Sequence, residues 1–298
     1  MTIFRQRRYR IRRAFSLVEL LVVMGIIALL AAIGIPALKG IGGTNDIGAA
    51  VRQLVDDLSY ARTKAINERT TVYVVFAGPS ILNQGWSSTE RREVAKHANL
   101  QFTSYALFTT RSLGDQPGRN NPRYLTDWRT LPDGVFVPTN KFDLEKYNDR
   151  TKMLNETLFN RPFFFSDPPD DYPPRGPGAT AEKYLFPFPT TNSTQRIPLP
   201  YIAFDFQGRL KLPASGYYTD DVIIPIVKGS IIYPQETPGG DPESITAAEV
   251  IETPKGNATN NPAIRIDWLT GRARVVRPML PTDKFASLQY MNYAERGQ

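Results

Sequence analysis

Carboxylates are the main groups with which this 298-residue chain could carry out acid–base chemistry. The chain has no cysteine and a single histidine, His97, so it offers no cysteine nucleophile and little from which to build a Ser-His-Asp triad or a multi-histidine metal site. We expect His97 at the surface, because it ends a charged run between two predicted strands. Glycoside hydrolysis needs only two carboxylates, and Asp205 and Asp267 form the only feasible pair.

Asp205 and Asp267 occur in two stretches of similar sequence. Each follows an apolar strand and is followed by a Gly-Arg step, Gly208-Arg209 in the first stretch and Gly271-Arg272 in the second. This pattern is typical of a tight hairpin turn in which the glycine adopts a positive φ. We therefore predict two hairpins, and nothing in the sequence places the two carboxylates near each other.

Two other groups of acids could suggest a site. Asp167, Asp170 and Asp171 offer oxygen atoms to a calcium ion, but their spacing matches no defined calcium loop, so we interpret them as a solvated turn. Asp56 and Asp57 are neighbours on a predicted helix, where they point about 100° apart and cannot converge on one bond. Solvation and capping explain this second pair better. We predict no metal and no cofactor.

The positive charge of the chain is concentrated at its N-terminus. The net charge is +7, and six of the 36 basic residues are arginines within residues 1–14, which contain no acid. The remainder of the chain is close to neutral. A basic body would indicate a nucleic-acid partner. Because the body is close to neutral, we predict no nucleic-acid partner.

A stretch of nineteen residues without a charge, Leu20–Leu38, follows the arginines. As a helix it would be about 28 Å long, which matches the hydrocarbon core of a bilayer. The arginines should stay in the cytoplasm, which places the chain after Leu38 outside it. A secretory signal usually has an apolar region of only about 7–15 residues. Glu19 precedes the stretch, and because a membrane charge costs about 2.5–3.5 kcal/mol, it implies a partner.

The segment Arg13–Leu21, with the sequence RAFSLVELL, resembles the processing site of type IV prepilins and type II secretion pseudoprepilins. The resemblance implies that a prepilin peptidase removes residues 1–14 by cutting after Ala14, and that the new N-terminal Phe15 is then methylated. The family usually has glycine where this chain has Ala14.

The same resemblance implies roles for two further residues. Glu19 would pair with the N-terminal amine of a neighbouring subunit, and Pro36 would kink the transmembrane part of the helix. The partners implied are other pilin or pseudopilin subunits, the prepilin peptidase and the inner membrane.

We predict a spine helix over residues 15–69, with residues 20–38 in the membrane. The glycine-rich segment Lys39–Gly43 is expected to loosen the helix, and Thr44, Asn45 or Asp46 to cap a second stretch. That stretch carries a helical apolar stripe that should lie against a sheet. The stripe consists of Ile47, Val51, Leu54, Leu58, Ala61 and Ala65.

Residues 54–76 resemble the GspH/FimT group of minor pseudopilins, in which a similar helix end leads into the first strand. This resemblance implies a minor or accessory subunit. A second possibility is a lineage-specific cassette protein that carries the same N-terminal motif on an enlarged body.

The body, residues 70–298, is predicted to be β-rich, which gives an α+β, pilin-like fold with a mostly antiparallel sheet. The predicted strands are Val72–Ala77, Leu100–Thr110, Gly134–Pro138, Pro162–Ser166, Tyr201–Leu212, Asp221–Tyr233 and Ala263–Val276. A short helix is expected at 143–156. Residues 162–200 hold ten of the 25 prolines and should form an exposed insertion, with a weaker break at 235–261. Phe163–Phe165 could be a core strand or a docking patch.

Two classes of function remain. The first is a non-enzymatic minor pilin or pseudopilin, anchored in the bacterial inner membrane with its body outside the cytoplasm. The alternative is a membrane-anchored enzyme or carbohydrate-binding module that uses Asp205 and Asp267. Neighbouring genes for a prepilin peptidase, an assembly ATPase or other prepilins would favour the first.

Overall fold

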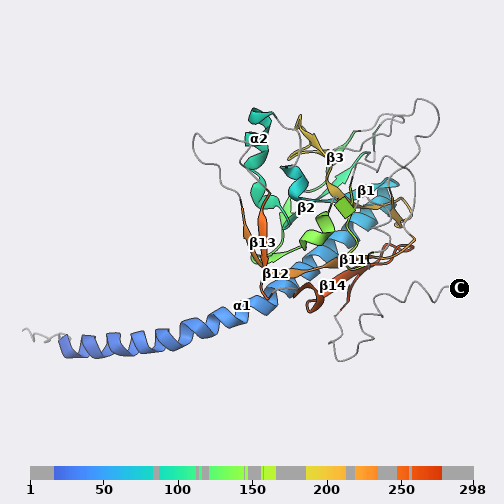
Figure 1. Cartoon of the computed structure of the whole chain (residues 1–298). Helices are drawn as coiled ribbons and strands as arrows, with labels where there is room; N and C mark the ends of the chain where they lie inside the picture. The colour runs from blue at the N-terminus through green and yellow to red at the C-terminus, as the bar shows by residue number, and fades with distance from the viewer. Residues whose placement is uncertain are drawn as a thin grey trace, which may run out of the picture. The chain divides into compact units, whose positions relative to one another are not determined.

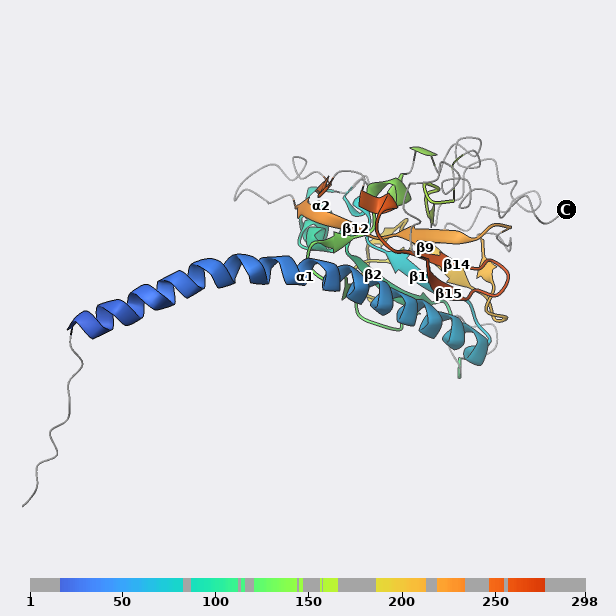
Figure 2. The same cartoon turned by 90° about the horizontal axis from the view of Figure 1, so that it is seen from below.

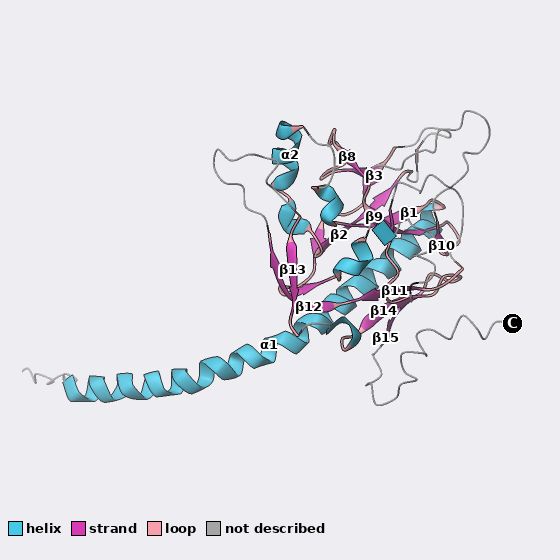
Figure 3. Cartoon of the chain, viewed as in Figure 1, coloured by secondary structure: helices cyan, strands magenta, loops and turns pink. Residues whose placement is uncertain are grey.

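The computed structural model describes residues 17–82, 87–111, 114–115, 121–143, 145–146, 156, 158–165, 186–212, 219–233, 247–254 and 257–276, without the side chains of 28–45 and 164–165. The chain divides into two compact units, residues 1–45 and 46–298. The predicted boundaries at 14 and 69 therefore stay predictions. The second unit, the body, consists mainly of strands and loops (Figure 3).

Helix α1 spans Leu17–Glu68 without interruption. The N-cap predicted at Thr44–Asp46 is therefore wrong. A second helix start would leave a further set of backbone N–H groups without partners, and an unbroken helix avoids this cost. After α1, Arg69 has a φ of 49°, and the N–H of Thr70 donates to the carbonyl of Ala65 over 3.1 Å. This left-handed residue ends the helix.

The main sheet is antiparallel and has seven strands. Figure 1 shows part of it beside α1. Its central path runs β10 (Leu210–Lys211), β9 (Pro200–Phe204), β1 (Val72–Phe76), β2 (Ser104–Thr109) and β3 (Arg123–Tyr124), while β4 (Arg129–Thr130) also pairs with β2 and β6 (Phe164–Phe165) with β9. Every residue of β1, β2 and β9 is buried. Their sequences are therefore mostly apolar, with Ser104 and Thr109 at the ends of β2 as the polar exceptions, and they lack the polar alternation of a half-exposed sheet.

Alternate residues of the central strands enter two separate cores. On one face, Val74, Leu107 and Ile202 pack against the body part of α1, which lies across the sheet (Figure 2). The predicted stripe from Ile47 to Ala65 is buried on this face, with each residue no more than 9% exposed, which confirms the prediction. On the other face, Tyr73 and Tyr201 pack edge-on to Phe186. The sheet is thus covered on both faces.

Three smaller antiparallel sheets complete the described body. They are β11 (Val222–Pro225), β14 (Ala263–Ile266) and β15 (Ala273–Val276); β13 (Glu249–Glu252), β12 (Val227–Ile232) and β5 (Val135–Phe136); and β7 (Phe186–Pro187) with β8 (Arg196–Ile197). Short 3₁₀ turns lie at Pro79–Ile81, Ala98–Leu100, Thr139–Phe142 and Asn257–Thr259. An N-terminal helix with a mostly antiparallel body, the α+β class, is the architecture predicted.

Several predicted strand bounds differ from the structure. The stretch Asp221–Tyr233 divides at Ile226 into β11 and β12, which belong to different sheets. Strand β2 begins only at Ser104, because a 3₁₀ turn and a positive φ at Phe102 precede it. Strand β13 lies inside the predicted break at 235–261. The helix expected at 143–156 and residues 166–185 of the Pro-rich insertion lie largely or wholly outside the described residues. The exposed insertion predicted over 162–200 is wrong for residues 186–200, which form β7, β8 and the start of β9. Their apolar side chains Phe186, Phe188, Ile197 and Leu199 are buried in the core.

Helix α2, Ser88–Ala95, was not predicted from the sequence. Ser87 caps it and accepts a hydrogen bond from the N–H of Glu90, while the N–H of Ser87 donates to the Glu90 carboxylate. Serine followed three residues later by glutamate is the sequence signature of a capping box. That signal could have identified the helix.

Candidate functional site

The N-terminal segment carries the strongest sequence signal, and the structure describes it from Leu17 onward. Ala14 and Phe15, the two predicted processing residues, lie outside the described residues. Glu19 lies in the first turn of α1, where a carboxylate complements the helix dipole. Large apolar side chains surround it and are exposed in the single chain, with Leu17 at 80%. They are Leu17, Val18, Leu20, Leu21, Val22, Val23, Met24, Ile26 and Ile27.

Exposed apolar surface of this extent indicates an interaction with a membrane or another protein. The backbone of α1 is helical through Pro36, but side chains 28–45 lie outside the description, so the kink and the span 20–38 stay predictions. Within the described part of the chain, no helix is both long enough and apolar enough to cross a bilayer.

Asp57 is a buried carboxylate on α1 that joins the helix to the sheet. The hydroxyl of Tyr105 donates to its Oδ2 over 2.6 Å, and Arg129 forms an ion pair with its Oδ1. Gln53, one turn earlier, donates to the Tyr105 hydroxyl and to the carbonyl of Thr130. The interpretation of Asp57 as a solvated or capping residue is therefore wrong, whereas its neighbour Asp56 is exposed as expected.

The contacts of Asp57 raise the pKa values of both of its partners. Burial and the bond to Asp57 raise the pKa of Tyr105, and the bond to Asp57 raises the pKa of Arg129. Both groups therefore keep their protons at neutral pH and serve as donors to the carboxylate. This network fixes the rotation of α1 on the sheet.

Replacing Asp57 by alanine should destabilise the body by about 1–3 kcal/mol, because it leaves the buried Tyr105 hydroxyl without its acceptor. Loss of the ion pair with Arg129 adds little to this cost, because the Arg129 side chain is 44% exposed and water screens its charge. The thermal unfolding midpoint of the full-length protein in detergent measures the effect. Asp56→Ala is the matched control and should change stability by less than about 0.5 kcal/mol. Equal midpoints for the two variants would contradict this role of Asp57.

Asp205 and Asp267 lie in two hairpin turns, as predicted. Oδ1 of Asp205 accepts hydrogen bonds from the N–H groups of Gln207 and Arg209, each over 2.8 Å. Oδ1 of Asp267 accepts from the N–H and hydroxyl of Thr270 over 2.7 and 2.8 Å. Each carboxylate therefore stabilises its own turn, which argues against a catalytic pair.

The two turns pack directly against each other and against α1. Gly208 and Gly271 have φ values of 78° and 63°, which confirms the positive dihedrals predicted for them. A side chain at Gly271 would collide with the carbonyl oxygen of Gly208. From α1, Arg62 donates to the carbonyl of Thr270 over 2.6 Å. The sequence did not show whether the two turns lie near each other. In the structure they are in contact, and this contact contributes to packing.

His97 is half-buried, whereas we expected it at the surface. Its ring lies edge-on to Phe188 with the ring centres 5.8 Å apart. Burial is the main cause that lowers the pKa of His97, so the imidazole is neutral at pH 7. Among the described residues, no group of three His, Asp or Glu side chains could hold a metal ion. Asp167, Asp170 and Asp171 lie outside that part.

Lys141 is a second buried charged residue that the sequence did not indicate. Its Nζ donates to the carbonyls of Leu158 and Arg161 over 3.2 and 2.8 Å. Burial lowers the pKa of Lys141 well below its usual value, and the charge of Arg161 adds to this. The bonds hold the segment that leads to Phe163, whose ring stacks on Phe76 at 4.6 Å. Phe163 is thus a core residue; the side chains of residues 164–165 are not described.

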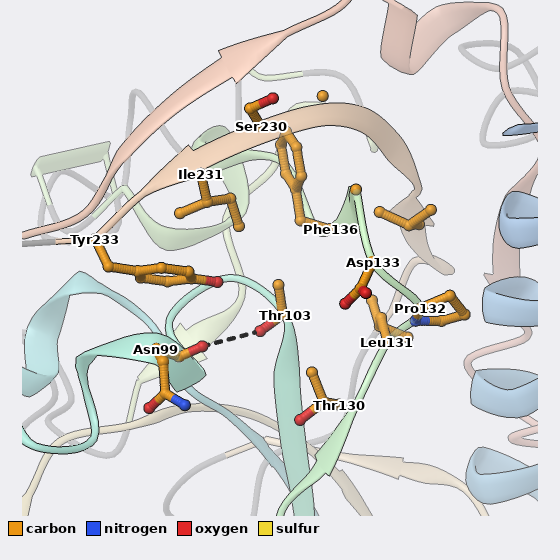
Figure 4. A pocket seen from close by; sticks show the side chains of 13 residues that line it. Asn99, Thr103, Thr130, Leu131, Pro132, Asp133, Phe136, Ser230, Ile231 and Tyr233 are labelled. Atoms are coloured by element: carbon orange, nitrogen blue, oxygen red, sulfur yellow. Dashed lines mark hydrogen bonds between the residues drawn. The ribbon is translucent and has the colours of Figure 1, made fainter. Parts of the chain in front are cut away.

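A pocket of about 460 Å³ opens beside β12, and we call it the β12 pocket (Figure 4). The hairpin strand β12 and Tyr233 form one wall, and segments before β2 and around β4 and β5 form the other. Its lining residues are Asn99, Thr103, Thr130, Leu131, Pro132, Asp133, Gly134, Val135, Phe136, Gly229, Ser230, Ile231 and Tyr233. Its size is within the roughly 300–1,000 Å³ of ligand pockets.

Comparison with known proteins gives one match. Residues 9–35 match the family model of the prokaryotic N-terminal methylation motif. This match supports a type IV pilin-like protein that a prepilin peptidase processes, and it includes Ala14, Phe15 and Glu19. No curated protein and no solved structure matches the chain.

Proposed function

We propose that this chain is a minor pilin or pseudopilin, a structural subunit of a type IV pilus or of a type II secretion-like filament. The match of residues 9–35 to the methylation motif carries the proposal. The order of elements agrees with it: an N-terminal helix with an exposed apolar segment continues into a helix packed on an antiparallel sheet.

The proposed path begins in the inner membrane. The arginine-rich leader stays in the cytoplasm, residues 20–38 cross the bilayer, and the body lies outside the cytoplasm. A prepilin peptidase then cuts after Ala14, and Phe15 becomes the methylated N-terminus. In the filament, the apolar residues of α1 leave the lipid and pack against like helices of other subunits. Glu19 pairs there with the N-terminal amine of a neighbour.

More specifically, we propose that the chain is a minor subunit similar to the GspH/FimT group. The sequence of residues 54–76 supports it, since this segment forms the end of α1 and leads directly into β1. The enzyme alternative has less support, because Asp205 and Asp267 are both bonded within their own turns. The motif itself supports a structural role.

Photocrosslinking from α1 tests assembly directly. A benzoyl-phenylalanine placed at Val22, whose side chain is 51% exposed in the single chain, should crosslink to other pilins in cells that contain the cognate assembly proteins. The same group at Lys96, an exposed body residue next to α2, is the control and should give no adduct with another pilin's helix. Membrane-inserted protein that gives no pilin adduct from position 22 would contradict the proposal.

A further inference from the structure

The charge of the β12 pocket limits the ligands that it could hold. Asp133 is its one charged lining residue, and among the described lining residues none is lysine, arginine or histidine. A phosphate or carboxylate group would meet a negative charge there with no cation to balance it. The pocket therefore suits a neutral polar ligand or a cation.

Two polar side chains of the pocket are available to a ligand. Within the described residues, Asn99 and Asp133 make no side-chain hydrogen bond, and both are exposed. Ser230 also lines the pocket from β12, but its hydroxyl lies on the opposite side of the strand from Ile231 and Tyr233 (Figure 4). By contrast, the hydroxyl of Thr130 lies 3.0 Å from that of Ser104, with which it shares a hydrogen bond. An amide and a carboxylate at one cavity offer both donors and acceptors.

Tyr233 supplies an aromatic surface to the same cavity. Its ring is half-buried, and its hydroxyl points across the pocket toward Thr103 (Figure 4). Burial is the main cause that raises the pKa of Tyr233; its side-chain hydrogen bond with Thr103 acts in the opposite direction, and the charge of Asp133 acts in the same direction as burial. The hydroxyl therefore stays protonated and can donate. An amphipathic aromatic ring of this kind offers a rigid apolar face together with a polar group.

We propose that the β12 pocket binds a neutral saccharide. A sugar ring has an apolar C–H face that can lie on Tyr233, and its hydroxyls both donate and accept. They match the set formed by Asn99 and Asp133. A lysine or arginine side chain could use Asp133 and the face of Tyr233, but it has no acceptor for the amide N–H donors of Asn99. The observations therefore favour the saccharide.

Binding can be measured by surface plasmon resonance on the full-length protein, captured in a detergent without a sugar head group. The probes are three neutral trisaccharides: chitotriose, cellotriose and mannotriose. At least one should bind with a Kd of about 1 mM or tighter. Trilysine and a heparin oligosaccharide test the cationic and anionic alternatives, and neither should bind in this range.

Substitutions locate the binding in the β12 pocket. Tyr233→Ala should weaken binding by about tenfold or more, as truncation of a central aromatic contact does. Asp133→Asn, at an exposed position that should not disturb folding, should weaken it about threefold or more, as loss of a charged hydrogen-bond acceptor does. Tyr60→Ala, which removes an exposed tyrosine on α1 that does not line the pocket, is the matched control and should bind as the parent does.

The proposal is overturned if none of the three trisaccharides binds, if trilysine or heparin binds in their place, or if Tyr233→Ala and Asp133→Asn leave saccharide binding unchanged. It does not rest on filament assembly. Both pocket variants should still crosslink to other pilins from position 22, so that the failure of one proposal is distinguishable from the failure of the other.

Discussion

Glu19→Ala should yield a protein of normal abundance, inserted in the membrane, that no longer crosslinks to other pilins from position 22. In a filament, the change removes the partner of the next subunit's N-terminal amine. Loss of one member of a buried ion pair costs roughly 3–5 kcal/mol, which corresponds to more than a hundredfold in an equilibrium constant. The measurement is the crosslinked fraction in the membrane, relative to total protein.

The same substitution distinguishes a filament subunit from a simple anchor. In an anchor, removal of a carboxylate at the edge of the hydrocarbon should ease insertion by up to about 2–3 kcal/mol and have no other effect. Glu93→Ala, which removes an exposed glutamate of α2, is the matched control and should crosslink normally. Crosslinking retained in Glu19→Ala would remove the assembly role that we assign to Glu19.

Ala14→Leu should leave residues 1–14 attached to the protein. The prepilin processing site usually has glycine at this position, so the peptidase subsite accepts a very small side chain, and leucine adds bulk that the subsite should exclude. Cleavage is expected to fall from nearly complete to undetectable, as measured by the mass of the protein co-expressed with a prepilin peptidase. Ala14→Gly is the control and should be cut as fast as the parent or faster.

The uncut variant should also fail to assemble. Its N-terminal amine is separated from residue 15 by the leader, and six arginines remain next to the apolar part of the helix. The uncut chain can therefore neither pair its N-terminal amine with Glu19 of a neighbour nor move its helix from the lipid into a filament. Efficient cleavage of Ala14→Leu, or crosslinking by the uncut protein, would contradict the proposed order of processing before assembly.

The parts of the fold that follow from local periodicity could be predicted. The stripe from Ile47 to Ala65 repeats every three or four residues, and such a repeat can be buried only by a helix on a flat surface. The Asp and Gly-Arg pattern likewise specifies each hairpin turn by itself, since its hydrogen bonds lie within five residues. Local signals of this kind need no knowledge of the remaining chain.

The parts that depend on distant partners could not be predicted. Asp57 reads as a surface residue until Tyr105 and Arg129, 48 and 72 residues further along the chain, are placed beside it. Lys141 is similar, because its acceptors are backbone carbonyls that no sequence pattern marks. The unbroken helix through Lys39–Gly43 shows that the cost of a second helix start can outweigh weak local glycine signals.

The β12 pocket illustrates the same limit for a candidate site. Its polar residues come from three separate segments, and strands of two residues such as β4 and β5 are too short to show periodicity. From the sequence, the residues around β5 are predicted only as a strand, Gly134–Pro138. Their function as part of a wall becomes visible only when β12 pairs with β5.

The mass of the mature N-terminal peptide tests the central claim most directly. The full-length chain is co-expressed with a prepilin peptidase, recovered from membranes and analysed by peptide mass spectrometry. We expect the chain to begin at Phe15, with one added methyl group on its amine and with residues 1–14 absent. A chain that begins after Ala32 or Ala37, or that keeps its leader when the peptidase is active, would contradict the pilin account.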